Sequence, residues 1–209
     1  MPSMRTRPSR IVLIALLVVA ALVLVAVVAV SAPILLHRSA GGSGQEIPAS
    51  AVPETTARGA DGRVRTLSAH DGDGPADLGA VAPGETLRID GSGFDAGIGI
   101  YVAVCAIPAS SEEKPGPCLG GIPEGAESGT VDESRLTSAW VTNDWAWRSF
   151  ATHQYSDASE GSFSVTLTMP EPASTGLDCR ETRCAIATRA DHTAGSDRVQ
   201  DMLLPAVYE

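Results

Sequence analysis

The chain has 209 residues, a formal net charge of −10, 21 Gly and 14 Pro, and only three each of Trp, Tyr and Phe, which predicts one turn-rich domain with appendages. Arg5, Arg7 and Arg10 lie in a first decapeptide without acidic residues, so the rest of the chain is more acidic still. Such a surface repels phosphate backbones, and we therefore expect no nucleic-acid partner.

An apolar stretch follows the basic residues 1–10. Residues 11–32 contain no charged side chain, and 33–36 extend the apolar run. A helix over 11–32 rises about 33 Å, which exceeds the roughly 30 Å of a bilayer's hydrocarbon core. The sequence predicts a membrane anchor over 11–36. Because the arginines precede it, the basic tail 1–10 is expected in the cytoplasm and the remainder outside.

A cleaved signal peptide is the competing interpretation of the same stretch. Val30, Ser31 and Ala32 resemble a small-residue cleavage site, and cleavage there would make the protein secreted. The apolar run is longer than the core of about 7–15 residues that is usual for signal peptides, and Pro33 would directly follow the cut. An uncleaved anchor in the cytoplasmic membrane is therefore favoured.

Residues 37–62 are rich in Gly, Ser, Ala, Pro and Thr, which predicts a flexible tether. Short stretches of alternating apolar and polar residues follow, separated by Gly and Pro turns, and they predict strands at 63–67, 86–90, 100–105, 163–169, 185–188 and 203–208. Pro205 places the last of them at a sheet edge. The long interval 107–161 is expected to hold a further strand or two. This pattern predicts an all-β antiparallel sandwich of about seven strands over 63–209.

Four cysteines, Cys105, Cys118, Cys179 and Cys184, all follow the apolar stretch. Their even number indicates disulfides in an oxidising compartment. Of the three pairings that four cysteines allow, we favour the two between neighbours in sequence, because short loops close fastest. A four-thiolate zinc site is the alternative, and we predict no metal.

All three tryptophans lie close together, and further aromatic residues follow them. They are Trp140, Trp145, Trp147, Phe150 and Tyr155. In an extended segment, Trp145 and Trp147 would share one face and Trp140 the other. Two interpretations stay open: these side chains cap the core under a long loop, or they form a recognition surface for a flat ligand or a partner.

Asp191 and His192 form an acid–histidine pair. His192 is a candidate ligand for haem iron or a divalent metal, although a histidine in such a turn is more commonly a hydrogen-bonding loop residue. No G-x-S-x-G, H-E-x-x-H or Walker motif occurs, and the cysteines are assigned to disulfides. We therefore expect no enzyme and name no cofactor.

Several motifs resemble the neocarzinostatin apoprotein family, actinobacterial immunoglobulin-like sandwiches that carry enediyne chromophores. The matching residues are 84–94, in which a strand closes on a G-x-G-aromatic corner, then Gly97, Tyr101, Val102, Cys105, Ala106, and the short loop of Asp178, Cys179 and Cys184. The resemblance covers about 63–209. It implies an immunoglobulin-like sandwich and supports the pairs Cys105–Cys118 and Cys179–Cys184. Residues 187–193 and 197–201 look more like the version in actinobacterial cell-surface proteins, some of which are associated with haem uptake.

The function expected from these features is a non-enzymatic, membrane-anchored, extracytoplasmic immunoglobulin-like module that recognises a protein or an envelope component. The alternative is a carrier of a planar apolar small molecule, such as haem or a chromophore-like natural product. The candidate surface for either ligand consists of Trp140, Trp145, Trp147, Phe150, Tyr155 and His192.

Overall fold

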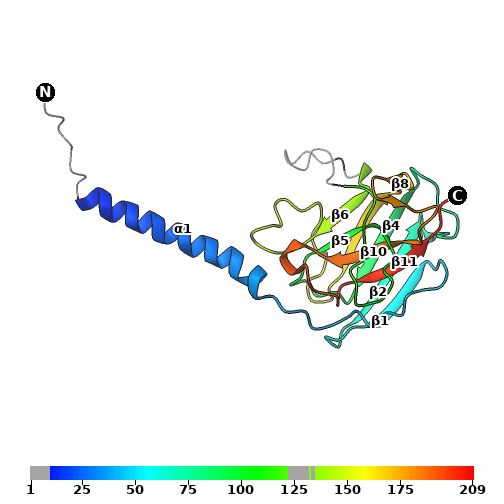
Figure 1. The fold of residues 1–209 in the computed structure, drawn as a ribbon, viewed down its shortest axis with the longest axis horizontal. Coiled ribbons are helices and arrows are strands. Elements are labelled where there is room, and N and C mark those ends of the chain that lie inside the picture. The colour runs from blue at the N-terminus through cyan, green and yellow to red at the C-terminus, as the bar shows by residue number, and fades with distance from the viewer. Residues whose placement is uncertain (1–9, 122–131, 133–134) are drawn as a thin grey trace, which may run out of the picture. The chain divides into compact units, whose positions relative to one another are not determined.

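The computed structural model describes residues 10–121, 132 and 135–209 and divides the chain into two units, one ending at His37 and one beginning at Arg38. The basic tail predicted over 1–10 lies outside the described residues, except for Arg10. The first unit is the helix α1, Arg10–Leu36 (Figure 1). None of its side chains is buried, and they are apolar on every side of the helix. With 27 residues it is about 40 Å long, so by length and composition it suffices to cross a membrane.

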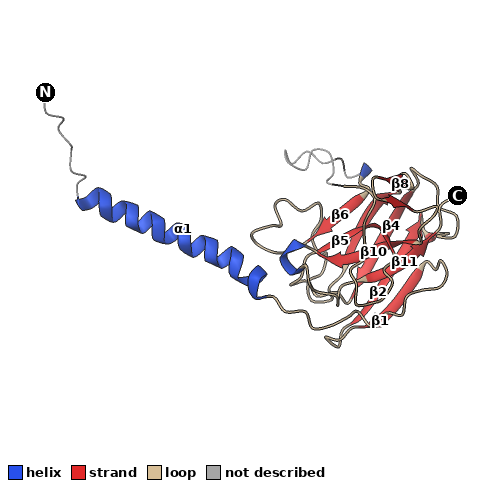
Figure 2. Ribbon diagram, viewed as in Figure 1, coloured by secondary structure: helices blue, strands red, loops and turns tan. Residues whose placement is uncertain are grey.

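The second unit consists of strands joined by turns and loops (Figure 2). Its strands are β1 (Glu54–Arg58), β2 (Val64–Asp71), β3 (Gly74–Pro75), β4 (Thr86–Ser92), β5 (Ile100–Ala106), β6 (Ser138–Val141), β7 (Phe163–Thr168), β8 (Ala173–Ser174), β9 (Leu177–Asp178), β10 (Cys184–Ala190) and β11 (Met202–Ala206). Each strand predicted from the sequence is present, and β6 is the strand expected inside 107–161.

The strands form an antiparallel sandwich. One sheet has the order β1-β2-β4-β7, with β3 paired to β2, and the other has the order β11-β10-β5-β6. If β2, β4, β5, β6, β7, β10 and β11 are counted as the first to seventh strands, the sheets read 1-2-5 and 7-6-3-4. This is the Greek-key order of immunoglobulin-like domains, to which β1 adds an outer strand. β11, which contains Pro205, is an edge strand, as predicted.

Alternating side chains from both sheets fill the core. Leu87 and Ile89 of β4 and Ile100, Val102 and Val104 of β5 are fully buried, in agreement with the faces predicted from the alternation. Residue 93 in the corner after β4 must be glycine, because φ is +76° and a Cβ would lie 1.8 Å from the carbonyl oxygen of Val64. This corner buries the ring of Phe94 edge-on against Phe163.

The prediction of a flexible tether over 37–62 is wrong, because this segment belongs to the folded domain from Arg38 onward. β1 pairs with β2 along its whole length. Gln45 is only 8% exposed, and its side-chain amide accepts a hydrogen bond from the backbone N–H of Leu203 (2.8 Å) and donates one to the carbonyl of the same residue (2.9 Å). The Gln45 amide therefore covers part of the edge of β11, and long-range hydrogen bonds order a segment whose composition suggested disorder.

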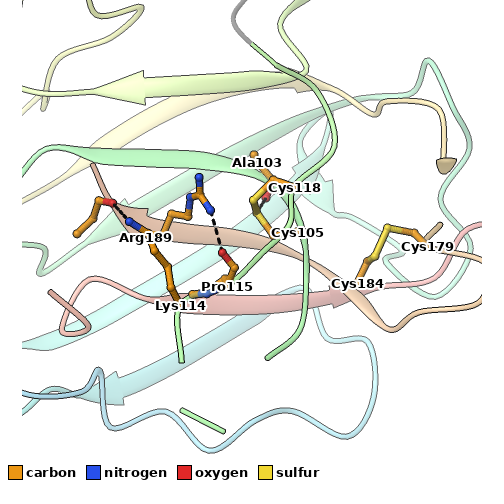
Figure 3. Close-up of a disulfide and its surroundings, with 9 residues drawn as sticks. Ala103, Cys105, Lys114, Pro115, Cys118, Cys179, Cys184 and Arg189 are labelled. Atoms are coloured by element: carbon orange, nitrogen blue, oxygen red, sulfur yellow. Dashed lines mark hydrogen bonds between the residues drawn. A yellow bond between two sulfur atoms is a disulfide. The ribbon is translucent and has the colours of Figure 1, made fainter. Parts of the chain in front are cut away.

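Both predicted disulfides, Cys105–Cys118 and Cys179–Cys184, are formed (Figure 3). Cys105 lies on β5, and Cys118 belongs to the segment that follows that strand. A second apolar cluster lies on the outer face of β5, β10 and β11, where this segment covers it. Its members are Ala103, Cys105, Ala185, Ala187 and Leu203, with Ile107 and Cys118 packed against them. The Cys105–Cys118 disulfide thus holds the segment over this face, and β10 is buried on both sides.

Candidate functional site

The site is built on a row of side chains that cross the outer face of the second sheet. Tyr101 of β5 lies opposite Trp140 of β6 on one side and Arg189 of β10 on the other. Their chain neighbours Ile100, Val141 and Ala190 point into the core, so all three side chains of the row project outward. The Tyr101 and Trp140 ring centroids are 5.9 Å apart, and the Arg189 guanidinium lies 6.0 Å from the centre of the Tyr101 ring.

Two further rings complete what we call the aromatic patch, defined as Tyr101, Trp140, Trp147 and His192. The His192 ring packs edge-on against Trp147 and Trp140, with centroid distances of 4.8 and 5.2 Å. Its Nδ1 is 2.9 Å from the Tyr101 hydroxyl, at hydrogen-bond distance. Burial, together with the negative charge of Asp191, raises the pKa of the Tyr101 phenol, which therefore stays protonated at neutral pH.

Asp191 supports the aromatic patch from the buried side. Its side chain is fully buried and accepts hydrogen bonds from Trp140 Nε1 (2.8 Å) and from the backbone and hydroxyl of Thr193 (2.8 and 2.6 Å). The bond to the Thr193 N–H caps the short 3-10 helix His192–Ala194, which appears in orange in Figure 1. The two residues of the acid–histidine pair therefore have different roles. Asp191 positions Trp140, and His192 packs against Trp147 and Trp140 at the surface.

The loop between β6 and Tyr155 carries the remaining tryptophans. Its ends are fixed, because the His153 N–H donates to the Trp140 carbonyl and the Thr142 N–H donates to the His153 carbonyl. Turns occupy 145–150, started by the Asp144 carboxylate, which accepts a hydrogen bond from the Ala146 N–H. These turns separate Trp145 from Trp147, so the extended arrangement in which the two would share a face is wrong.

The sequence-predicted aromatic residues fall into three groups. Trp140 and Trp147 are half-buried in the patch, whereas Trp145 and Phe150 are 66% and 65% exposed. Tyr155 is not a surface residue: it is 5% exposed, packs against Phe163 and donates a hydrogen bond from its hydroxyl to the Ile98 carbonyl. Reasoning from the sequence missed Tyr101 and Arg189, although Tyr101 alternates with inward-facing Ile100 and Val102 and is therefore expected to project outward.

The His192 ring contacts Tyr101, Trp140 and Trp147. Among the described residues, no group of three or more His, Cys, Asp or Glu side chains is arranged to hold a metal ion. A pocket of about 220 Å³ lies elsewhere, beside the Cys179–Cys184 disulfide, and is lined by 49–51, 179–184 and 205–207. Its volume is below the roughly 300–1,000 Å³ that is usual for ligand sites, and none of its lining residues is aromatic.

The fold and the patch together define the class of this protein as an immunoglobulin-like antiparallel sandwich with an aromatic surface on one sheet. No protein-family model matches the sequence, and the searches of curated proteins and of solved structures likewise find no match. The resemblance to the neocarzinostatin family therefore stays a prediction.

Replacing Trp140 by Phe is expected to destabilise the domain by about 1–3 kcal/mol, because the buried Asp191 carboxylate loses the indole donor. The exposed Trp145 is the matched control, and Trp145→Phe is expected to stay within about 0.5 kcal/mol of wild type. Urea unfolding followed by circular dichroism measures both changes. Equal midpoints for the two variants would contradict the supporting role of the Trp140–Asp191 bond.

A cluster of charged residues, formed by Lys114, Arg198 and Asp201, lies next to the 3-10 helix. The Asp201 carboxylate is 6% exposed and 2.6 Å from Arg198, and Lys114 donates hydrogen bonds to the carbonyls of Ala190 and Gly195. Burial raises the pKa of Asp201 to about 7, against the opposing effects of Arg198 and Lys114. Burial, followed by the charges of Arg189 and Arg198, lowers the pKa of Lys114. Figure 3 shows Lys114 and Arg189 near the Cys105–Cys118 disulfide.

The domain is therefore expected to become more stable as the pH falls from about 8 to about 5. In this window folded Asp201 takes up a proton, whereas the carboxyl of the unfolded chain, with a pKa near 3.9, does not. Asp201→Asn is expected to remove this pH dependence, which urea titrations at several pH values would detect. A variant with the same pH profile as wild type would show that Asp201 is ionised throughout this window.

Proposed function

We propose that this protein is a non-enzymatic, membrane-anchored, extracytoplasmic immunoglobulin-like module that recognises a component of the cell envelope through its aromatic patch and the adjacent loop 144–150. The observation that carries the proposal is the exposure of Trp145 and Phe150 on a loop whose base is held against the patch. Exposed large aromatic side chains gathered at one place are typical of interaction surfaces.

The proposed location is the outer face of the cytoplasmic membrane. α1 is long and apolar enough to span a bilayer, and arginines precede it, which favours an inside N-terminus. The two disulfides fit an oxidising compartment. Cleavage after Ala32 would instead release the domain, and the intact mass of the protein isolated from its envelope distinguishes the two forms.

A neocarzinostatin-like ancestry is part of this proposal. Two features support it: the Greek-key strand order, and two short disulfides at the positions that the resemblance implies. The alternative function, a carrier of haem or a chromophore-like natural product, is favoured by one feature. Trp147 and His192 present an edge-to-face pair beside Trp140 and Tyr101, against which a flat apolar molecule could stack. Native mass spectrometry of the protein from its own envelope would reveal such a cargo as added mass.

Oxidative footprinting tests whether the loop is occupied. We expect Trp145 and Phe150 to be protected in native envelopes relative to the purified full chain, because a bound component would cover them. Val64 and Val207, which are 44% and 54% exposed on other parts of the domain, are the internal controls and should react equally in both samples. Equal labelling of Trp145 and Phe150 in both samples would refute recognition through this surface.

A further inference from the structure

The loop 144–150, which carries the exposed aromatic residues, has no net charge, although the protein is acidic. Its one acidic residue is Asp144 at its start, whose carboxylate accepts a hydrogen bond from the Ala146 N–H, and Arg148 is exposed between Trp145 and Phe150. At physiological ionic strength charges are screened within about 8 Å, so a surface that approaches this loop encounters Arg148 and Asp144 rather than the net charge of −10. Tryptophan, phenylalanine and arginine side chains in one surface are typical of protein segments that lie in the headgroup region of a bilayer.

The same end of the domain receives the chain that follows α1. Ser39 Oγ accepts a hydrogen bond from the Arg198 N–H (3.3 Å), and Gly42 forms a parallel bridge with Arg198. The Arg198 guanidinium donates to the carbonyl of Gly195 (2.6 Å), directly after the 3-10 helix that places His192 against Trp147. In sequence, only His37 and Arg38 lie between the last residue of α1 and Ser39.

We propose that the component recognised by this surface is the lipid bilayer itself, with Trp145 and Phe150 inserted at the boundary between headgroups and acyl chains and Arg148 paired with anionic headgroups. This inference rests on the membrane anchoring proposed above. It combines two independent observations: an exposed loop that carries two aromatic side chains and an arginine and has no net negative charge, and a chain that joins the domain at that end within two residues of an apolar helix.

Because the domain is tethered to α1, a weak contact with the bilayer is enough for docking. Two exposed aromatic side chains and one arginine give only modest affinity for a bilayer when a protein is free in solution. A short covalent link to a helix in the same membrane raises the effective concentration to the millimolar range, so the docked state is populated without further contacts. Docking would restrict how the domain is oriented on the membrane and would leave its other faces accessible.

The chain supplies its own probe for this proposal. Its three tryptophans are Trp140, Trp145 and Trp147, and α1 contains no aromatic residue, so tryptophan fluorescence reports on this surface alone. We would reconstitute the full chain in phosphatidylcholine–phosphatidylglycerol vesicles with ordinary or brominated acyl chains. Bromine quenches indoles at short range, and we expect lower fluorescence in the brominated vesicles. Most of this quenching should be absent in Trp145→Phe, which keeps an aromatic ring but removes the most exposed indole.

Three variants separate docking from general effects on the protein. Phe150→Ala is expected to reduce the quenching of Trp145, whereas Val207→Ala, which removes a comparably exposed apolar side chain elsewhere, should leave it unchanged. Arg148→Gln should weaken the quenching in vesicles that contain phosphatidylglycerol and have no effect in pure phosphatidylcholine.

Equal fluorescence in ordinary and brominated vesicles would overturn the proposal. If Trp145 is nevertheless protected in native envelopes, the occupant is a protein or a polymer of the envelope, and the proposed function stands without the lipid. If the natural protein lacks α1 because it has been cleaved, the anchoring itself fails, which its intact mass shows separately.

Discussion

A chain that begins at Arg63 is expected to lose most of its folding stability relative to one that begins at Arg38. The deletion removes β1, the Gln45 side chain on the edge of β11, and Asp61, the carboxylate partner of Arg65. Leaving a buried charge without its partner costs about 3–5 kcal/mol, which is comparable to the whole stability of a small domain, about 5–15 kcal/mol. The shorter chain should therefore be unfolded or aggregated even with both disulfides intact.

A third chain that begins at Glu54 separates the contributions. It keeps β1 and Asp61 but lacks Gln45, so the Leu203 backbone loses two hydrogen bonds and the expected cost is about 1–3 kcal/mol. In urea unfolding, the chain that begins at Glu54 should have a lower midpoint than the chain that begins at Arg38, and the chain that begins at Arg63 should show no cooperative transition. Identical midpoints for the chains that begin at Arg38 and Arg63 would mean that residues 38–62 contribute nothing to the fold.

Replacing Asp61 by Ala is expected to destabilise the domain by about 3–5 kcal/mol, because it strands the buried Arg65 guanidinium. The Arg65 side chain is fully buried, donates to both Asp61 oxygens (3.0 and 2.6 Å) and donates from Nε to Gln200 (2.9 Å). In the double variant Asp61→Ala/Arg65→Met the charge is gone and an apolar side chain fills the space beside Phe94, so most of the loss should be recovered. A double variant no more stable than Asp61→Ala would contradict this explanation.

The contribution of the Asp61–Arg65 ion pair to folding stability is expected to depend on pH. The hydrogen bonds from Arg65, with its positive charge, lower the pKa of Asp61 despite partial burial. A carboxyl whose folded pKa is lowered contributes stability above its unfolded pKa of about 3.9 and loses that contribution as the pH falls below it. Wild type should therefore lose more stability than Asp61→Ala between about pH 5 and pH 2, which urea titrations would show.

Local patterns sufficed for most of the strands. In β4 and β7 the apolar side chains alternate with others, and burial follows that alternation because successive side chains of a strand point to opposite faces. β1 escaped prediction because only Ala57 of its five residues is buried. Gln45 gave no local signal at all, since its partner Leu203 is 158 positions away.

Most members of the candidate site could be predicted from the sequence, but their arrangement could not. Trp140, Trp147 and His192 were all predicted as surface residues. Their contact with one another depends on the strand register that sets Tyr101 opposite Trp140 and on the turns at 145–150. Tyr155 entered the core because Ile98 offers its hydroxyl an acceptor and Phe163 offers its ring an apolar neighbour. No periodicity in the sequence encodes those partners.

The all-β class, the apolar helix and the two disulfides follow from the sequence alone, because they depend on side-chain periodicity, on a continuous apolar run and on short loop closures. Long-range packing decided the other features. These are the exposure of each tryptophan, the contact of His192 with two of them, and the inclusion of residues 38–62 in the domain. These features depend on strand register and on hydrogen bonds between distant residues, and such contacts form only once the two sheets have come together.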